Sequence, residues 1–554
     1  MPKNFLIGMG GSGEKAVEAF IYLAAAGMVK SGEEIQIAMI DQDITCGNYT
    51  RCEKTFANYV EFNKVMAKLG SQRPYSACSI IYDNSWNLQI AVDAVAPNGN
   101  ATDLKSTFGA DPETDEADII DCLFSEGEQL FKTDKGYYGH PTFGSLIVNA
   151  AMATPSFNNS PLLQALKTAH QNGDVNIFLV GSNFGGTGAA MFPNIAKKLR
   201  TVLSDGTNQV KICGALLLPY FRVGDNQGEN AHKDISLAHF YKKSAISLDS
   251  YIKEPVGGYD VVYGGKGEKF IYDRIVLIGS PSPQNTIENE AVRFSDSLGS
   301  SKQIHHLCLP DMSAALSACS FFEDPGKFCD IDNRNANTDT SSNLNYTAIS
   351  ITPVAGAEIT GEVSIKDLPG SDIKINLEKF TRFALMSVGY LAPMIIRSHK
   401  DNKPTDDCRS IFIKKRGLFG IGASLIEPAE IQTNIDDLSS VVQFLSDYLK
   451  TIYLIQERYI DDGNHAGRLF EYNDISVLHK VASVAIHKTT SDGWVNTPAD
   501  LLGDLGKIIY GITDNEINGS TIRQNAISGN KLNYEDTDAL LRVSRVLNLT
   551  FESC

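Results

Sequence analysis

Two glycine-rich segments, each placed between an apolar run and a stretch of helical periodicity, constrain the fold of this chain most strongly. Residues 8–13 read GMGGSG and follow an apolar run at 5–7. Residues 181–188 read GSNFGGTG and follow an apolar run at 175–180. Glycine allows a positive φ and lets backbone N–H groups approach a phosphate, and a helix that begins there adds its positive end. Both segments therefore predict phosphate cradles at the carboxyl ends of strands.

The surroundings of these segments predict an α/β fold with a Rossmann-like parallel sheet. Residues 14–29 have apolar positions at helical spacing, and a second apolar run at 35–40 ends in Asp41-Gln42-Asp43. A strand–helix–strand unit of this kind implies parallel strands joined by a right-handed crossover. Further strands are expected at 210–218 and 274–278, and further helices at 141–151, 189–203 and 310–322.

Taken alone, the first segment leaves other interpretations open. It fits the dinucleotide-binding fingerprint G-x-G-x-x-G, with Asp41 or Asp43 as the acidic residue that ends the next strand. An NAD-dependent oxidoreductase would use this loop only and would leave residues 185–188 without a role. The glycines could also serve simply to let a helix pack close to the sheet. A Walker loop does not fit, because Glu14 stands where its lysine belongs.

The two segments together resemble the nucleotide loops of the tubulin/FtsZ superfamily. Residues 9–17 (MGGSGEKAV) are similar to the first loop of FtsZ, and residues 184–190 (FGGTGAA) are similar to the tubulin signature G-G-G-T-G-[ST]-G. Asp41-Gln42-Asp43 holds the place of the second loop, near ribose and Mg²⁺, and residues 211–219 resemble the strand after the signature. The resemblance follows the order and spacing of the family up to residue 219 and continues more faintly to Phe322.

The resemblance implies a site for GTP or GDP with Mg²⁺, while ATP stays open as an alternative and no residue is assigned as a direct metal ligand. We expect the two cradles to converge on one triphosphate. A third loop, for the γ-phosphate, is expected at 136–141 and includes Gly139. The base is expected against Asn285 or Asn289 and against Asp311, near the start of a core helix at 310–322. The other residues expected at the nucleotide are Gly10, Gly11, Ser12, Gly13, Asp41, Asp43, Asn183, Gly185, Gly186, Thr187 and Gly188.

Three features depart from the family pattern. Glu14-Lys15 replaces the pair of asparagines that FtsZ-like proteins place near the nucleotide, and Phe184 replaces the first glycine of the signature. The chain, at 554 residues, is also longer than a typical FtsZ or tubulin. It is therefore more similar to the divergent bacterial or phage tubulin-like families than to a cell-division FtsZ.

The resemblance also implies that subunits stack head to tail and complete hydrolysis at their interface, as a GTPase. Such a contact is heterologous and need not close, so it yields filaments. The acid that activates water would come from the next subunit. Asp367 and Glu378 are the two candidates, and each also fits a turn residue or a helix cap. A different interpretation is a nucleotide-responsive scaffold in a multi-protein bacterial system that neither hydrolyses nor polymerises.

Composition shifts divide the chain into four parts. A tubulin-like nucleotide domain is expected at 1–322, followed by a linker at 323–345 in which Asp, Asn, Ser and Thr dominate. A smaller α+β domain is expected at 346–435. The helical region expected at 436–554 opens with an amphipathic helix at 436–459 and could serve protein partners.

The charge balance excludes some classes of partner. Lys and Arg number 49 against 66 Asp and Glu, and the net charge of −17 argues against direct binding to nucleic acid or to an anionic membrane. No apolar run reaches the ~20 residues that cross a bilayer, so we expect no membrane span and a cytoplasmic location. The 10 cysteines are scattered, as in a reducing compartment. A zinc site is an alternative for a group of histidines and cysteines, although their spacing matches no ordinary zinc motif. The group consists of His305, His306, Cys308, Cys319 and Cys329.

Overall fold

The structure is a computed structural model that describes part of the chain, and all structural statements below concern that part. The described residues are 3–30, 32–67, 75, 78–83, 88–89, 104–108, 113, 115–130, 136–137, 140–204, 207–220, 271–279, 305–329, 346–350, 377, 379–381, 383–384, 387–388, 413–415, 424–425 and 428–457.

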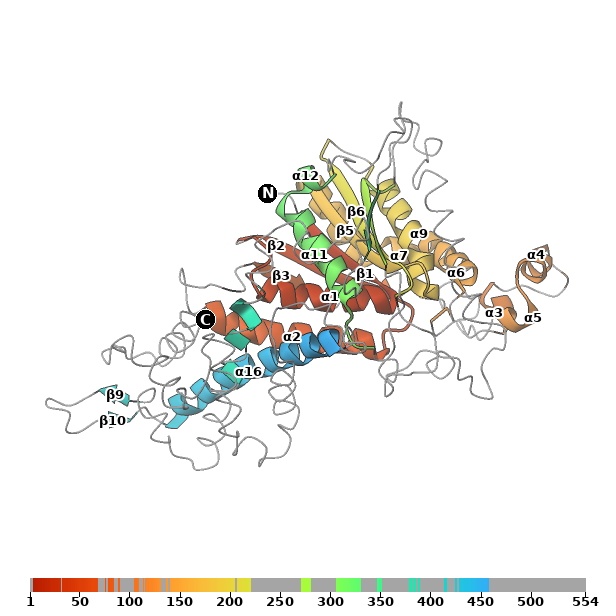
Figure 1. Cartoon of the computed structure of the whole chain (residues 1–554). Helices are drawn as coiled ribbons and strands as arrows, with labels where there is room; N and C mark the ends of the chain where they lie inside the picture. The colour runs from red at the N-terminus through yellow and green to blue at the C-terminus, as the bar shows by residue number, and fades with distance from the viewer. Residues whose placement is uncertain are drawn as a thin grey trace, which may run out of the picture. The chain divides into compact units, whose positions relative to one another are not determined.

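A parallel sheet forms the centre of the fold, with strand order β3-β2-β1-β5-β6-β7-β8 and with β4 also paired to β2 (Figure 1). The strands are β1 Lys3–Met9, β2 Glu34–Asp41, β3 Ser79–Tyr82, β4 Leu88–Gln89, β5 Val175–Ser182, β6 Val210–Leu217, β7 Arg274–Gly279 and β8 Tyr346–Ser350. The predicted Rossmann-like parallel sheet is therefore confirmed. The strands at 210–218 and 274–278 are confirmed to within one residue.

The order of the sheet reverses at β1, which creates a topological switch point. On one side Ile7 of β1 pairs with Ala38 of β2, and on the other side it pairs with Leu179 of β5. The carboxyl ends of the three strands therefore lie side by side. In open parallel sheets, ligands bind in the crevice outside such a point.

Helices lie on both faces of the sheet, so that strands β1 and β5 are buried on both sides. The helices described between residues 10 and 329 are α1 Gly10–Ala25, α2 Gly47–Ala67, α3 Leu104–Phe108, α4 Asp115–Leu123, α5 Glu126–Gln129, α6 Pro141–Ala153, α7 Pro155–Asn158, α8 Pro161–Asn172, α9 Gly186–Val202, α11 Leu309–Glu323 and α12 Pro325–Cys329. Ile177 and Leu179 of β5 join the core formed with α6, α8 and α9. Phe178, between them, contacts Phe321 of α11 and Phe328 of α12 on the other face.

The chain divides into two compact units whose boundaries interleave along the sequence. The first unit contains Met1–Phe20, Gly32–Glu53 and Ser79–Gly370, and the second contains Ile21–Ser31, Lys54–Cys78 and Ser371–Cys554. The predicted division at 322, 345 and 435, with its smaller α+β domain and helical C-terminal region, stays a prediction.

The second unit has an aromatic core built on a long helix, α16 Pro428–Glu457. The ring of Phe444 stacks on Phe62 with centroids 4.8 Å apart, and Tyr448 meets Phe380 edge-on at 4.8 Å. The helix predicted at 436–459 thus exists but begins earlier, at Pro428. A short antiparallel pair, β9 Ile413–Lys415 and β10 Ser424–Leu425, belongs to the same unit. Within the described residues, none of the helices has the length and apolarity to cross a bilayer.

Candidate functional site

The two glycine-rich loops meet at the switch point, backbone against backbone. Gly10 begins α1 with φ +68°, and a Cβ added to it would lie 2.9 Å from the backbone nitrogen of Gly188. A Cβ added to Gly188 would in turn lie 3.2 Å from the backbone oxygen of Met9. Only glycine at both positions permits this approach. The expected convergence of residues 8–13 and 181–188 is therefore present.

Two of the glycines in the first loop have a different role. A Cβ on Gly8 would lie 2.6 Å from the backbone oxygen of Gly13, and a Cβ on Gly13 would lie 2.6 Å from that of Val180. These residues let α1 start close against β1 and β5. Gly8 and Gly13 thus fit the interpretation that glycines let a helix pack close to the sheet, while Gly10 lies where the two loops meet.

The second loop presents the start of α9 without a side-chain cap. Gly185 is the N-cap residue, with an extended backbone at φ −81° and ψ 152°. Because it is a glycine, it has no side chain that could bond to the N–H groups of the first turn. The loop is held in place by Asn183, whose backbone nitrogen donates to the Leu217 oxygen at 3.0 Å. The first N–H groups of a helix have no partner within the helix. An uncapped helix start of this kind suits an anion.

Part of the predicted third loop lies next to the second. A Cβ added to Gly136 would lie 3.7 Å from the Thr187 hydroxyl oxygen. Tyr137 is fully buried, and its backbone oxygen accepts from the His140 nitrogen at 2.7 Å, directly before α6. Gly139, the residue named from sequence, lies outside the described residues.

A buried acidic cluster lies at the ends of β1 and β2. Possible ligand atoms of Glu14, Asp41 and Cys46 all lie within 4.8 Å of one another, and the three residues are 0%, 4% and 3% exposed. The Cys46 thiol donates to Glu14 Oε2 at 3.2 Å. Burial, and then the charge of Asp41, raises the pKa of Glu14 well above its usual range; burial also raises the pKa of Asp41 to about 6.

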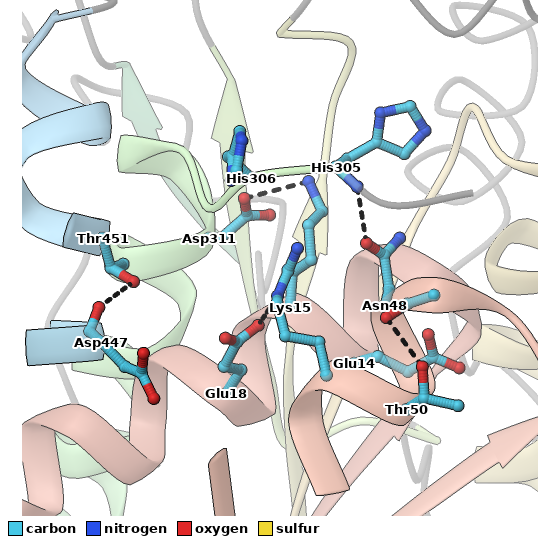
Figure 2. Close-up of polar contacts among 12 residues, drawn as sticks. Glu14, Lys15, Glu18, Asn48, Thr50, His305, His306, Asp311, Asp447 and Thr451 are labelled. Carbon is cyan, nitrogen blue, oxygen red and sulfur yellow. Dashed lines mark hydrogen bonds and ion pairs between the residues drawn. The ribbon is translucent and has the colours of Figure 1, made fainter. Parts of the chain in front are cut away.

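Lys15 joins the starts of α1 and α11 in a buried network (Figure 2). Its ammonium donates to the Tyr220 hydroxyl at 2.5 Å and to Asp311 Oδ2 at 3.1 Å. The Tyr220 hydroxyl donates to Asp311 Oδ1 at 2.8 Å, and the Cys308 backbone nitrogen donates to Oδ2 at 2.8 Å. The ring of Phe184 meets Tyr220 edge-on at 5.6 Å. Lys15 and Phe184, which both depart from the FtsZ pattern, therefore both contact Tyr220.

Asn48 fastens the segment before α11 to the first loop. Its Oδ1 accepts from the His305 backbone nitrogen at 2.8 Å (Figure 2). Its Nδ2 lies 3.1 Å from where a Cβ on Gly11 would stand. Burial, with Lys15 and Arg51 nearby, lowers the pKa of His305 to about 4.

The depressed pKa of His305 predicts a loss of stability in acid. Between pH 6.5 and 4 the unfolded chain takes up a proton at this histidine that the folded chain does not, so the free energy of unfolding falls as the pH falls. The contribution amounts to up to about 2–3 kcal/mol. Urea denaturation at pH 7 and pH 4.5 should show a smaller drop in His305→Asn, which keeps the backbone bond to Asn48. An equal drop in both proteins would contradict this assignment.

The described structure accounts for the predicted residues in three ways. Residues 10–13 and 185–188 lie at the meeting of the loops, while Asp41 and Asp43 lie at the adjacent end of β2 and its following turn. Both carboxylate oxygens of Asp311 are engaged by Lys15, Tyr220 and the Cys308 nitrogen. The rest lie outside the described residues: Gly139, Asn285, Asn289, Asp367 and Glu378. Roles in nucleotide binding or catalysis stay predictions for all of them.

The acidic cluster is the feature that the sequence did not indicate. Glu14 was notable only as a departure from the family, and nothing distinguishes Cys46 among 10 scattered cysteines. In the part of the chain that the structure describes, the group able to surround a metal ion is Glu14, Asp41 and Cys46, and it includes neither His305 nor Cys308. The zinc alternative named from sequence is thus not assembled among these residues.

Comparison with known proteins gives one match. A family model described as "Tubulin like" matches residues 147–235. No curated protein and no solved structure matches the chain. The matched segment contains β5, the second glycine loop, α9 and β6, and it leaves out the first loop. The contact of Gly10 with Gly188 is therefore a separate observation from the match. The match shows that residues 147–235 are similar to the tubulin-like family.

Proposed function

We propose that the chain binds a guanine nucleotide where the two loops meet and assembles head to tail into filaments. The observation that carries the proposal is the backbone contact of Gly10 with Gly188 at the switch point of the sheet. Two helices, α1 and α9, begin at this point. Their N-termini can hold a polyphosphate from two sides. An NAD-dependent oxidoreductase that uses the first loop alone leaves this contact without a purpose.

The residues around the loops fit the parts of a nucleotide site. Uncapped N–H groups of α9 can bind phosphate oxygens, and the Thr187 hydroxyl adds a donor next to Gly136. The carboxylate of Asp43, in the turn after β2, is the kind of ligand that Mg²⁺ takes, and its Oδ2 is buried without a hydrogen-bond partner. Mg²⁺, when bound, would spread the negative charge of the phosphates.

Hydrolysis in this proposal is a property of the assembly. One subunit holds the nucleotide, and an acid from its neighbour orients water, with Asp367 and Glu378 kept as the candidates. GTP turnover per subunit is therefore expected to rise with protein concentration and to level off once filaments form. Phosphate release and light scattering, measured over the same dilution series, test this. A rate per subunit that is independent of concentration would contradict interface catalysis.

Replacement of Gly186 by valine tests the phosphate cradle. Gly186 is buried in the first turn of α9, and a branched side chain there crowds the N–H groups that face the ligand. The affinity for GTP is expected to fall by at least ~100-fold, which corresponds to about 2.7 kcal/mol. Calorimetric titration with GTP, GDP, ATP and NAD, each with Mg²⁺, measures the loss and also decides the base. An unchanged circular dichroism spectrum is the control for folding, and retained affinity would show that this loop is not the cradle.

A nucleotide-responsive scaffold that neither hydrolyses nor polymerises is the second candidate. The observation that favours it is the buried carboxylate of Asp311, which already accepts from Lys15, Tyr220 and the Cys308 nitrogen. A base at this residue would have to share the carboxylate with these three donors. Tight GTP binding without turnover or filaments in negative-stain microscopy would support the scaffold instead.

A further inference from the structure

The cluster of Glu14, Asp41 and Cys46 brings three chain segments to one point. Glu14 lies in the first turns of α1, Asp41 is the last residue of β2, and Cys46 directly precedes α2. Their potential ligand atoms lie within 4.8 Å of one another, and Cys46 Sγ is 3.2 Å from Glu14 Oε2. Zinc bonds of about 2.3 Å to sulfur and about 2.0–2.2 Å to oxygen place the ligand atoms of a tetrahedral site about 3.3–3.6 Å apart, so shifts of about 1 Å or less in the side chains would complete the site.

The negative charge of this cluster has no cationic partner in the described part of the chain. Ion pairs made by residues of α1 and α2 include those of Lys15 with Asp311 and of Arg51 with Glu18, and no ion pair found among the described residues includes Glu14, Asp41 or Asp43. Glu14 Oε1 and Asp43 Oδ2 are both buried without a hydrogen-bond donor. Buried carboxylates in such surroundings are paired, protonated or bound to a metal ion. The unpartnered Glu14 oxygen is therefore a position that a metal ion can take in place of a proton.

The set of ligand atoms selects the class of metal. Mg²⁺ takes oxygen ligands and keeps several waters. A cysteine sulfur next to two carboxylates instead suits a borderline ion such as Zn²⁺, which binds sulfur, nitrogen and oxygen. Three protein ligands also leave one position of a tetrahedral site for water or another ligand.

We propose that Glu14, Asp41 and Cys46 form a binding site for a divalent ion of the Zn²⁺ class, occupied without nucleotide. Binding would release the thiol proton of Cys46 and place two positive charges among the carboxylates. The ion would join the start of α1, the end of β2 and the turn before α2. It would also lie beside the first loop, because Glu14 Oε2 is 3.9 Å from where a Cβ on Gly11 would stand.

The test uses the full chain, stripped with a chelator, in the absence of nucleotide. Titration with Co²⁺ should produce the sulfur-to-cobalt charge-transfer absorption of thiolate ligation, and calorimetry with Zn²⁺ should give one ion per chain. Cys46→Ser and Glu14→Gln are each expected to weaken Zn²⁺ binding by at least ~100-fold. Two matched controls, Cys52→Ser at a buried site in α2 and Cys122→Ser at an exposed site, should bind as the unaltered chain does.

Three outcomes would overturn the proposal. They are the absence of the cobalt–thiolate band in the unaltered chain, undiminished Zn²⁺ affinity in Cys46→Ser, and a preference for Mg²⁺ that Cys46→Ser leaves unchanged. The last would indicate a site of carboxylates alone. The spectrum of the unaltered chain decides the matter even where a variant fails to fold. Since no nucleotide is added, the result is independent of the proposed GTP site.

Discussion

Replacing Gly10 with alanine is expected to lower the free energy of unfolding by about 3–5 kcal/mol. Two costs add at this residue. Its φ of +68° disfavours any side chain, and the new Cβ would lie 2.9 Å from the Gly188 nitrogen, which belongs to a backbone that is fixed by β5 and α9. Urea denaturation followed by far-ultraviolet circular dichroism measures the loss.

Gly32→Ala is the matched control for this variant. Gly32 also has a positive φ, +84°, but a Cβ there would meet nothing within 4 Å. Its replacement therefore costs the backbone strain alone, about 1–2 kcal/mol. An equal loss in the two variants would mean that Gly10 and Gly188 are not in contact, and the proposed cradle would lose its main support.

Replacing Asp311 with alanine is the second change with a large expected effect. Asp311 is fully buried, and its carboxylate accepts from Lys15, from Tyr220 and from the Cys308 backbone nitrogen. The substitution leaves a buried ammonium, 6% exposed, without its counter-charge. Breaking a buried pair in this way costs about 3–5 kcal/mol. The same denaturation measurement applies.

A double-mutant cycle separates the ion pair from the rest of the network. Lys15→Met removes the charge and keeps an unbranched apolar chain. Because the penalty of Asp311→Ala comes largely from the unpaired ammonium, the double variant should be less destabilised than the sum of the single ones, by about 1–3 kcal/mol. Strict additivity would contradict the pairing of Lys15 with Asp311.

The sheet and its loops could be predicted from sequence because their signals are local. An unbroken apolar run indicates a strand that is buried on both faces, and β5 is buried at every position from Val175 to Ser182. Glycines between such a run and a helical stretch mark the turn. Helix starts were less well predicted: α9 begins at Gly186 where 189 was expected, since a first turn carries little periodicity.

The contacts between distant residues could not be predicted in the same way. Lys15 meets Tyr220 across 205 positions and Asp311 across 296, and no spacing rule links residues so far apart. The sequence indicates Asp311 as a contact for the base, but its pairing with Lys15 depends on the topology of the sheet. Cys46 gave no signal for the same reason, because its position beside Glu14 depends on how α1 and β2 pack.

The order of the strands in the sheet differs from their order in the sequence, and this has a consequence for synthesis of the chain. β1 is made first, yet it takes its place between β2 and β5, and its loop is completed by Gly188. A nascent chain that has not yet released β5 from the ribosome therefore exposes one edge of β1 and only half of the glycine junction. Closure of that junction requires that β1, β5 and the loop that holds Gly188 have all emerged, and pairing of parallel strands so far apart in the sequence is slow.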